Sequence, residues 1–379
     1  MSLDNIRSEI DKIDAELIPL LSKRLDCSLT VAEIKKSEGI PVLDVAREEA
    51  IIAKVREKGG KYGDYIAGVY QTIMDTSKEL QHDSMHKDSH LGKTIAAAGL
   101  IDPNAHTGKV ICQGAKGAFS AEAAGRIFPS ATPEFVGSFR DVFEAVERGD
   151  AKYGIVPVEN SNAGSVSEVY DLLMEFRHYI VRGIDLKISQ NLLGVKGATL
   201  SDIEEVYSHP QGIAQSAAFI KSHGLTATEY SNTAVAARMI AEAGDKTKAA
   251  IGSLAAAEEY GLDVLARDIQ SAGHNSTRFI AISKQLELSG NSNKVSLVFA
   301  IPHVTGSLCR ILGRFSSHGL NLTKLESRMA AGGDFHYLFY LDFTGNVQDE
   351  NTVKLICEMS EELPDFAFLG NYNEIPYKE

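Results

Sequence analysis

The chain lacks several features on which whole classes of protein depend. It has four cysteines, Cys27, Cys112, Cys309 and Cys357, and none of them forms a CxxC pair. Such scattered cysteines are typical of reduced thiols in a cytoplasmic protein, and they offer no ligand set for zinc or another metal. No run of about 18 apolar residues occurs, so we expect no membrane-spanning helix and no membrane partner. The formal net charge of -13 leaves no basic excess, which argues against nucleic acid as the main partner.

Length and composition are otherwise those of an ordinary globular protein. At 379 residues, 44% of them apolar, the chain is long enough for two or three domains that each bury a core. The first residues, "MSLDNIRSEIDKIDAEL", are charged from Asp4 onward, so we do not expect a signal peptide. A multidomain cytoplasmic protein is therefore predicted.

The first part of the chain has the periodicity of helices. Apolar residues recur at spacings of three and four from Leu3 to about Glu38, which predicts one long amphipathic helix that Gly39 ends. Two further helices are expected, over 45–58 with Asp44 as N-cap and over about 64–81. We expect an all-helical domain over 1–88, followed by a linker over 89–107.

The rest of the chain alternates strands with helices in two different orders. From 108 to 286, strands such as "KVICQG", "YGIVPVEN" and "RFIAI" alternate with helices such as "SVSEVYDLLMEF", which predicts an α/β domain with parallel strands. After "LSGNSNK" the pattern changes to strand, helix, strand, strand, helix, strand over 292–379. This βαββαβ order predicts a small α+β domain of the split, ferredoxin-like kind.

Three cations of the first helix are too far apart for one small ligand. Arg24 and Lys35 are 11 residues apart and face the same side, about 16 Å from each other along the axis. Arg7 lies 17 residues before Arg24, about 25 Å away. The three could converge only if two such helices pack antiparallel, with Arg7 completing the site of the partner chain.

The two following helices carry further polar groups on shared faces. Asp44, Arg47 and Glu48 lie at i, i+3 and i+4, and Ser77 and Gln81 lie one turn apart. Taken singly, such residues are typical of solvated helix surfaces.

Their order and spacing resemble the all-helical class of chorismate mutases, in which an intertwined dimer builds each site from both chains. The resemblance implies that the substrate is bound by Arg7 of the partner chain, Arg24, Lys35, Asp44, Arg47, Glu48, Ser77 and Gln81. The rearrangement needs no nucleophile and no cofactor, only cations that hold a dianion compact and a donor to the breaking ether oxygen. Lys35, with a protonated Glu48 or Gln81, is expected to be that donor.

Four stretches of the central segment gather polar side chains near strand ends. They are "GAKGAFS" ending at Ser120, "VPVENSNAGSV", "SHPQGIAQ" and "NSTRF". The first stretch places a flexible loop before a helix N-terminus, where backbone N–H groups can bind a carboxylate. Its sequence matches neither GxGxxG nor a Walker loop. Each has a purely structural alternative: the glycines can shape turns, Asn160 and Ser208 can cap helices, His209 fits a turn residue better than a base, and Arg278 can pair with a surface carboxylate. No Ser/His/Asp order supports covalent catalysis.

The last three of these stretches, together with "AAIGS", resemble prephenate dehydratase over roughly residues 108–285. That resemblance implies two α/β lobes like those of periplasmic solute-binding proteins, with the active site in the crevice between them. It implies catalytic roles for Glu159, Asn160, Gln215 and Thr277, and substrate contacts from Ser120, Asn160, Ser161, Ser208, Thr277 and Arg278. One position departs from the family, which commonly has an acidic residue where this chain has Ser271.

The implied dehydration also needs no cofactor. Prephenate loses its ring hydroxyl and CO₂ together, and formation of an aromatic ring drives the reaction. The protein must supply a hydrogen-bond donor to the departing hydroxyl and anchors for the carboxylates. We expect Thr277 to donate to the leaving oxygen and Arg278 to bind a substrate carboxylate.

The stretch "VTGSLCRILGRFSSHGLNLTKLESRM" near the C-terminus resembles an ACT domain of the kind that binds phenylalanine. The resemblance implies a ligand site between paired domains, formed by Thr305, Gly306, Ser307, Leu308, Asn321, Leu322, Glu326, Ser327 and Arg328. Ser307 and Cys309 depart from the usual Gly-Ala-Leu-Val pattern, and Met329 replaces a proline. A dimerisation domain without a ligand is the alternative.

These resemblances predict a bifunctional enzyme that uses chorismate and prephenate, responds to L-phenylalanine and forms at least a homodimer. Two other hypotheses stay open at this point. The lobes and the C-terminal domain could belong to a solute-binding or sensory protein, or the helices could serve a dehydratase only for dimerisation. Formation of phenylpyruvate from chorismate by the purified protein would separate the three.

Overall fold

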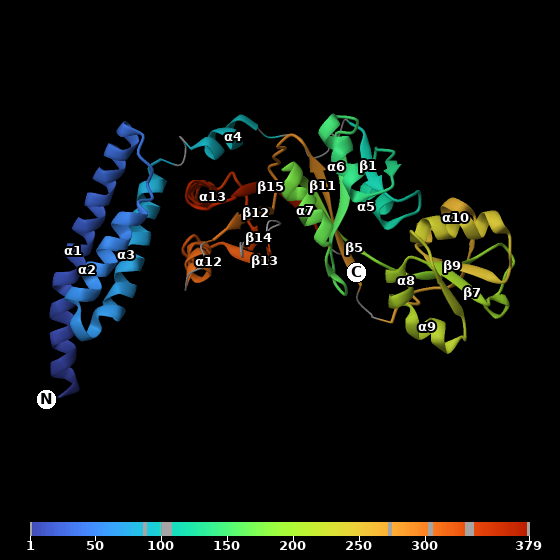
Figure 1. The fold of residues 1–379 in the computed structure, drawn as a ribbon, viewed down its shortest axis with the longest axis horizontal. Helices are drawn as coiled ribbons and strands as arrows, with labels where there is room; N and C mark the ends of the chain where they lie inside the picture. The colour runs from blue at the N-terminus through green and yellow to red at the C-terminus, as the bar shows by residue number, and fades with distance from the viewer. Residues whose placement is uncertain are drawn as a thin grey trace.

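The computed structural model describes residues 2–85, 89–98, 100, 108–271, 275–301, 306–329 and 337–376. Figure 1 shows a helical part at one end, the C-terminal part in the middle and two α/β lobes at the other end. Within the described residues, no helix is both long enough and apolar enough to cross a membrane.

The N-terminal part consists of long helices, as predicted. They are α1 (Leu3–Glu38), α2 (Val45–Lys58) and α3 (Gly63–Asp83), with a short 3-10 turn η1 (Gly60–Tyr62) between the last two. Gly39 ends α1 in the left-handed conformation, with φ of 67°, and the Asp44 side chain accepts from the backbone N–H of Arg47 at the start of α2. A further helix, α4 (His90–Ala98), packs through Ile95 on the C-terminal part.

The central part divides into two lobes. The first contains β1 (Val110–Gln113), β2 (Glu134–Val136), β3 (Tyr153–Asn160), β4 (Gly164–Ser165), β5 (Tyr179–Lys187) and β11 (Ser276–Ser283), with α5 (Phe119–Ile127), α6 (Phe139–Arg148) and α7 (Ser167–Phe176). The second contains β6 (Asn191–Gly194), β7 (Glu205–Ser208), β8 (Thr226–Glu229), β9 (Lys248–Gly252) and β10 (Asp263–Ala266), with η3 (Leu200–Asp202), α8 (Pro210–Gln215), α9 (Ala217–Ser222), α10 (Thr233–Ala243) and α11 (Leu254–Tyr260).

The sheets are mixed, so the prediction of parallel strands throughout the central part is wrong. In the first lobe β1 pairs in parallel with β2 and β3, but β11 is antiparallel to both β3 and β5. In the second lobe β7 is parallel to β8 and β9, whereas β6 is antiparallel to β9 and β10. The reason is the path of the chain, which leaves the first lobe after β5 and returns to it through β11.

The two crossings between the lobes lie side by side. The backbone N–H of Ile188, just after β5, donates to the carbonyl of Asn275, just before β11, at 2.8 Å. Close by, the backbone N–H of Ser271 donates to the carbonyl of Gln215 at 2.8 Å. The crossings therefore form the floor of the crevice between the lobes.

The C-terminal part has the predicted order of strands and helices. It contains β12 (Lys294–Ala300), α12 (Ser307–Ser317), β13 (Asn321–Met329), β14 (Tyr337–Thr344), α13 (Glu350–Glu362) and β15 (Ala367–Ile375). The strands follow the order β13-β14-β12-β15, each antiparallel to its neighbour. The two helices cover one face of this sheet, and α7 of the first lobe covers the other, where Tyr170 contacts Tyr340.

One connection between the parts was not expected from the sequence. The end of β15 pairs in parallel with β5, with Glu374 opposite Gly183. The C-terminal sheet and the first-lobe sheet therefore form one continuous sheet of ten strands. The C-terminal strands are thus hydrogen-bonded, through β15 and β5, to the sheet that borders the crevice.

Candidate active sites

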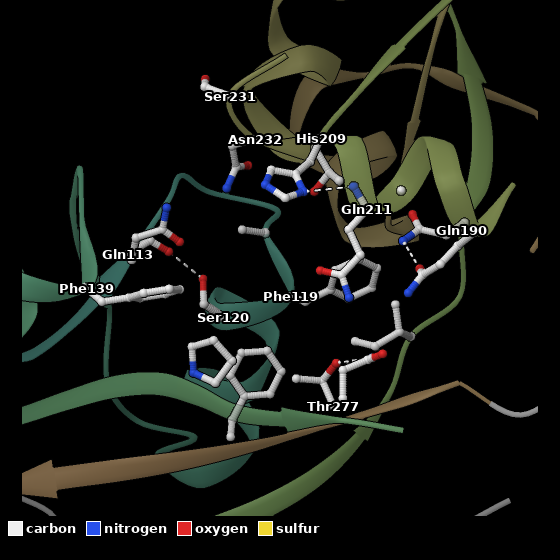
Figure 2. Close-up of a pocket in the computed structure, with 18 residues that line it drawn as sticks. Gln113, Phe119, Ser120, Phe139, Gln190, His209, Gln211, Ser231, Asn232 and Thr277 are labelled. Carbon is white, nitrogen blue, oxygen red and sulfur yellow. Dashed lines mark hydrogen bonds between the residues drawn. The ribbon is translucent and has the colours of Figure 1, made fainter. Parts of the chain in front are cut away.

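A cavity of about 270 Å³ lies in the crevice between the two lobes (Figure 2). The first lobe contributes side chains from β1, α5, β3 and β11, and the second contributes α8 and the turn before α10. Four of the predicted dehydratase residues line this cavity: Ser120, Asn160, Gln215 and Thr277. Segments far apart in the sequence are thus brought together around one cavity.

Thr277 and Asn160 form the central hydrogen bond of the cavity. The Nδ2 of Asn160 donates to Thr277 Oγ1 at 2.9 Å and to Asn275 Oδ1 at 2.9 Å. Its Oδ1 accepts from the backbone N–H groups of Asn162 and Ala163, which fixes the orientation of the amide. Because Thr277 Oγ1 accepts a hydrogen bond, its own proton remains available for a group in the cavity.

Gln215 is oriented in the same manner from the second lobe. Its Oε1 accepts from Gln190 Nε2 at 3.1 Å and from Asn275 Nδ2 at 3.1 Å. Within the described residues its Nε2 has no hydrogen-bond partner, so it can donate to a ligand. Gln190 and Asn275 were not among the predicted site residues, although Asn275 begins the "NSTRF" stretch.

Among the described residues, those that line the cavity include no lysine and no arginine. The positive ends of helices take their place: α5 begins at Phe119 beside Ser120, and α10 begins after Asn232, whose side chain caps it by accepting from Ala234 N at 2.8 Å. Backbone N–H groups at such helix starts bind carboxylates well. The described lining therefore offers no cationic anchor for a carboxylate, and the start of α5 is the positively polarised backbone beside the cavity.

His209 lines the cavity but acts in the structure as a capping residue. Its Nδ1 accepts from the backbone N–H of Gln211 at 3.2 Å, at the start of α8. Burial lowers the pKa of His209, an effect that Glu229 only partly opposes, so the neutral ring is favoured. The interpretation of His209 as a turn residue agrees with this geometry.

Four predicted residues lie outside the cavity: Ser208, Ser161, Glu159 and Arg278. Ser208 is fully buried and donates to the carbonyl of Ile251 at 2.8 Å, so it has a structural contact. Ser161 Oγ accepts from the backbone N–H of Ser276 at 3.0 Å. The Glu159 carboxylate pairs with Lys324 of β13 at 2.9 Å. The expectation that these side chains touch the substrate does not match their positions.

Arg278 requires the clearest correction. Successive side chains of a strand point to opposite faces, so Arg278 of β11 points away from the cavity that Thr277 lines. Its guanidinium contacts Asp342, Tyr372 and Glu374 of the C-terminal part. Burial opposes its charge, but these neighbours outweigh burial and raise the pKa of Arg278 above its ordinary value. Arg278 therefore does not bind a ligand in the crevice.

In the helical part, three predicted mutase residues gather between α1 and α3. Arg24 Nη1 donates to Ser77 Oγ at 2.6 Å, and Gln81 Nε2 donates to the carbonyl of Ser77 at 3.2 Å. The Oε1 of Gln81 is buried and has no partner within the described residues. An unpaired buried acceptor of this kind is costly, and a ligand donor would satisfy it.

The other predicted mutase residues do not converge on this point within one chain. Lys35 Nζ donates to the carbonyl of Val42 at 2.6 Å, and the oxygens of Glu48 accept from Lys78 at 3.1 and 3.2 Å. The side chain of Asp44 caps α2, whereas Arg47 and Arg7 are exposed.

Lys78 was missed by the sequence reasoning, and its only signal was its place between Ser77 and Gln81. Burial lowers its pKa, but Glu362, Glu48 and Asp75 raise it by a larger amount. Its charged side chain therefore belongs to the same polar cluster as the predicted site residue Glu48. While Glu48 accepts from Lys78, it cannot serve as the donor that was expected of it.

The residues predicted to bind phenylalanine fall into two separate groups. Gly306, with φ of 81°, and buried Ser307 begin α12 together with Leu308, whereas Asn321 and Leu322 follow its far end. Thr305 lies outside the described residues. Glu326 and Arg328 belong to neither group.

Glu326 and Arg328 point toward the first lobe. Glu326 contacts Ser165, and Arg328 Nη1 donates to the carbonyl of Ser167 at 2.5 Å. Strand alternation turns Ser327 to the opposite, exposed side. The two charged residues therefore hold the C-terminal part against the first lobe rather than lining one site with Gly306.

Within the described residues, no group of three or more His, Cys, Asp or Glu side chains is arranged to hold a metal ion. All four cysteines are free thiols, two of them buried.

Two family models match the chain: chorismate mutase type II over residues 6–82 and prephenate dehydratase over residues 110–287. The bifunctional chorismate mutase/prephenate dehydratase of Enterobacter agglomerans is 32% identical over 378 residues, covering 97% of this chain and 95% of that protein. The enzyme of the same name from Aquifex aeolicus is 31% identical over 379 residues, covering 98% of this chain and 97% of its own. Among solved structures, the prephenate dehydratase of Arthrobacter aurescens in complex with L-Phe is 30% identical, with a TM-score of 0.64, covering 70% of this chain and 89% of that one. The chain therefore belongs to the family of bifunctional chorismate mutase/prephenate dehydratases.

Proposed function

We propose that the helical part rearranges chorismate to prephenate and that the crevice between the lobes converts prephenate to phenylpyruvate. The observation that carries the second assignment is the Thr277 hydroxyl, which Asn160 holds in the crevice with its proton free to be donated. The mutase assignment rests on the match to the mutase family and on the cluster of Arg24, Ser77 and Gln81 between α1 and α3.

In the crevice, the chemistry depends on oriented donors. The bond between the ring and its carboxylate breaks, CO₂ leaves, and the electron pair enters the ring and expels the hydroxyl group on the opposite carbon. Thr277 donates a hydrogen bond to that oxygen as negative charge develops on it, and the oxygen leaves as water after taking up a proton. Gln215 Nε2 and the backbone N–H groups at the start of α5 are proposed to hold the carboxylates.

In the helical part, the reaction requires a compact bound conformation and no covalent step. Arg24 is proposed to bind a substrate carboxylate with Ser77, and Lys35 and Gln81 to donate to the breaking ether bond. Lys35 is engaged by the carbonyl of Val42 in this structure and would have to leave that contact to reach the substrate. Asp44, Arg47 and Glu48 of α2 are the remaining residues that we assign to this site.

A second copy of the chain completes the mutase site in this proposal. Its support is a long apolar stripe on α1 that is exposed in one chain: Leu3, Ile6, Ile10, Ile13, Leu17, Ile18, Leu20, Leu29, Val31 and Ile34. Exposed apolar surfaces of this extent mark protein interfaces. An antiparallel copy of α1 would cover the stripe and bring its own Arg7 to the Arg24, Ser77 and Gln81 cluster of this chain.

We assign the C-terminal part as an ACT domain that binds L-phenylalanine. Supporting observations are its βαββαβ order and the relative from Arthrobacter aurescens, whose structure contains L-Phe. The start of α12 with Gly306 and the start of β13 with Asn321 are separated by the 11-residue length of α12, about 16 Å. One small ligand can contact both only if two copies pair, so the effector is proposed to bind between two chains.

The decisive experiment follows each product separately with the purified protein. We expect phenylpyruvate from chorismate and from prephenate with no second protein added. L-phenylalanine should lower the dehydratase rate, because effector and substrate favour different arrangements of one assembly. Formation of phenylpyruvate from prephenate but not from chorismate would contradict the mutase assignment. Absence of phenylpyruvate with either substrate would contradict both assignments. A dehydratase rate that is unchanged at saturating phenylalanine would contradict the role of phenylalanine as effector.

A further inference from the structure

Arg278 belongs to a buried cluster that lies directly behind the dehydratase site. In the continuous sheet its Cα lies opposite Glu159 of β3 and opposite Asp185 of β5. Its side chain is 12% exposed and borders a second cavity, of about 380 Å³, on the face of the sheet opposite the crevice. The charged groups around that cavity are Glu159, Asp185, Lys294, Lys324, Asp342 and Glu374.

All three partners of its guanidinium come from the C-terminal part. Arg278 Nη1 donates to Asp342 Oδ2, its Nε donates to Glu374 Oε1, and its Nη2 donates to Tyr372 Oη, each at 2.5 Å. Asp342 and Tyr372 are themselves buried and are held by the hydroxyl of Ser296, at 2.5 and 2.8 Å. A planar guanidinium bound on three sides fixes both the position and the direction of its strand.

The strand needs such a fixation at this point because its pairing is irregular. The register between β11 and β3 shifts between Arg278 and Phe279, one residue after Thr277. A shift of this kind interrupts the ladder of hydrogen bonds and changes the direction of neighbouring side chains. Asn160, which holds Thr277, lies on β3 across the same interrupted ladder.

From this arrangement we infer that Arg278, Asp342 and Tyr372 are positioning residues for the dehydratase reaction. They hold β11 from behind so that the Thr277 hydroxyl keeps its direction toward the departing oxygen. The dehydratase site is thus completed by the C-terminal part of the same chain, although none of the described side chains of that part lines the crevice. The inference rests on the dehydratase function proposed above.

The test compares steady-state kinetics with prephenate for Arg278→Gln, Asp342→Asn, the double variant and Tyr372→Phe. We expect Arg278→Gln and Asp342→Asn each to lower kcat about 10- to 100-fold, with KM within about threefold of the wild type, because a misplaced donor lowers the rate without weakening binding. The kcat of the double variant should be no more than about threefold lower than that of Arg278→Gln, because both changes break one cluster. Tyr372→Phe removes a single hydroxyl and should lower kcat by a smaller factor.

Mutase activity in the same preparations reports whether the chain has folded. Arg140→Gln is the matched control, since Arg140 makes a bidentate pair with Glu175 on the outer side of the first lobe, and its kinetics should equal those of the wild type.

A rise in KM for Arg278→Gln with kcat unchanged would overturn the inference, because it would indicate substrate binding. Effects of Arg278→Gln and Asp342→Asn that multiply in the double variant would overturn it as well. If a buried-charge variant fails to fold, Tyr372→Phe decides: a wild-type kcat overturns the inference and a lowered kcat with unchanged KM supports it. A wild-type protein that makes no phenylpyruvate from prephenate would instead contradict the proposed function itself.

Discussion

Thr277 is the single residue on which the dehydratase assignment depends most. It is buried apart from the face that borders the cavity, and its oxygen accepts a hydrogen bond from Asn160. The hydroxyl proton of Thr277 can be donated toward the cavity while Oγ1 accepts from Asn160, and a departing hydroxyl group requires such a donor. The amide of Asn160 is fixed in turn by two backbone N–H groups.

Thr277→Ala should therefore lower dehydratase kcat by about 10²- to 10³-fold, the usual effect of losing one donor to a developing negative charge. Mutase activity of the same protein should be unchanged, because Thr277 lies in a different part of the chain from α1 and α3. The measurement is the initial rate with each substrate separately. Thr277→Ser, which keeps the hydroxyl, is the matched control and should retain most of the activity. Equal loss of both activities in Thr277→Ala would count against the assignment.

The position of Arg278 could have been anticipated from the sequence. Thr277 and Arg278 are neighbours in a segment that was predicted as a strand, and neighbours in a strand face opposite sides. The two therefore could not both reach one substrate. What the sequence could not provide was the identity of the partners, because Asp342 and Glu374 lie 64 and 96 residues further along the chain.

At the scale of elements, the last turns of α3 serve two neighbours at once. One side carries Ser77 and Gln81 of the proposed mutase site, and another contacts the C-terminal part through His82. His82 is buried between Glu361 and Glu362 of α13, with ring nitrogens at 3.1 and 3.0 Å from their oxygens. Burial lowers the pKa of His82, but these two bonds outweigh burial and raise it to about 9.

The packing of α3 on α13 should consequently weaken as the pH rises. A pKa raised from 6.5 to about 9 contributes stability that is fully present below pH 6.5 and is lost as the pH rises through 9, at most about 3 kcal/mol. We expect the difference in urea midpoint between the wild type and His82→Gln to be large at pH 6 and small at pH 9.

The control variant for this measurement is His223→Gln, since His223 is exposed and contacts Ser222 and Phe219 rather than a carboxylate. The difference in urea midpoint between the wild type and His223→Gln should be the same at pH 6 and pH 9. A difference between the wild type and His82→Gln that does not change with pH would show that the His82 charge does not hold the two helices together.

Elements with a long, regular period were the ones that the sequence predicted well. The apolar spacing of α1, its glycine end and the Asp44 cap are local features, and the structure has them where they were expected. Strand direction in the lobes was predicted wrongly, because direction depends on where the chain returns after visiting the other lobe. The pairing of β15 with β5 had no local signal, since it joins two segments about 190 residues apart.

At the scale of the whole molecule, the C-terminal part is the element that contacts both catalytic parts. It meets the helical part through α13 and α3, and it extends the first-lobe sheet through β15 and β5. An effector bound in this part therefore has physical routes to both sites. Lys324, which pairs with Glu159 beside Asn160, lies on one of these routes.

The proposed mutase site, by contrast, is shared between two chains, and this proposal leads to a prediction about the assembly. Arg24 is held between α1 and α3, whereas Arg7 is exposed near the other end of α1. If Arg7 completes the site of the partner chain, Arg7→Ala and Arg24→Ala should each abolish most mutase activity, while a dimer that contains one of each retains one intact site.

Refolding the two variants together in equal amounts should accordingly restore about a quarter of the wild-type mutase activity, because half of the dimers are mixed and each mixed dimer has one intact site of two. Each variant refolded alone is the control and should recover nothing, and dehydratase activity should be the same in all samples. The readout is the initial rate of chorismate consumption. Absence of recovery in dimers shown to be mixed would mean that Arg7 does not act across the interface, and the antiparallel arrangement of α1 would lose its chemical support.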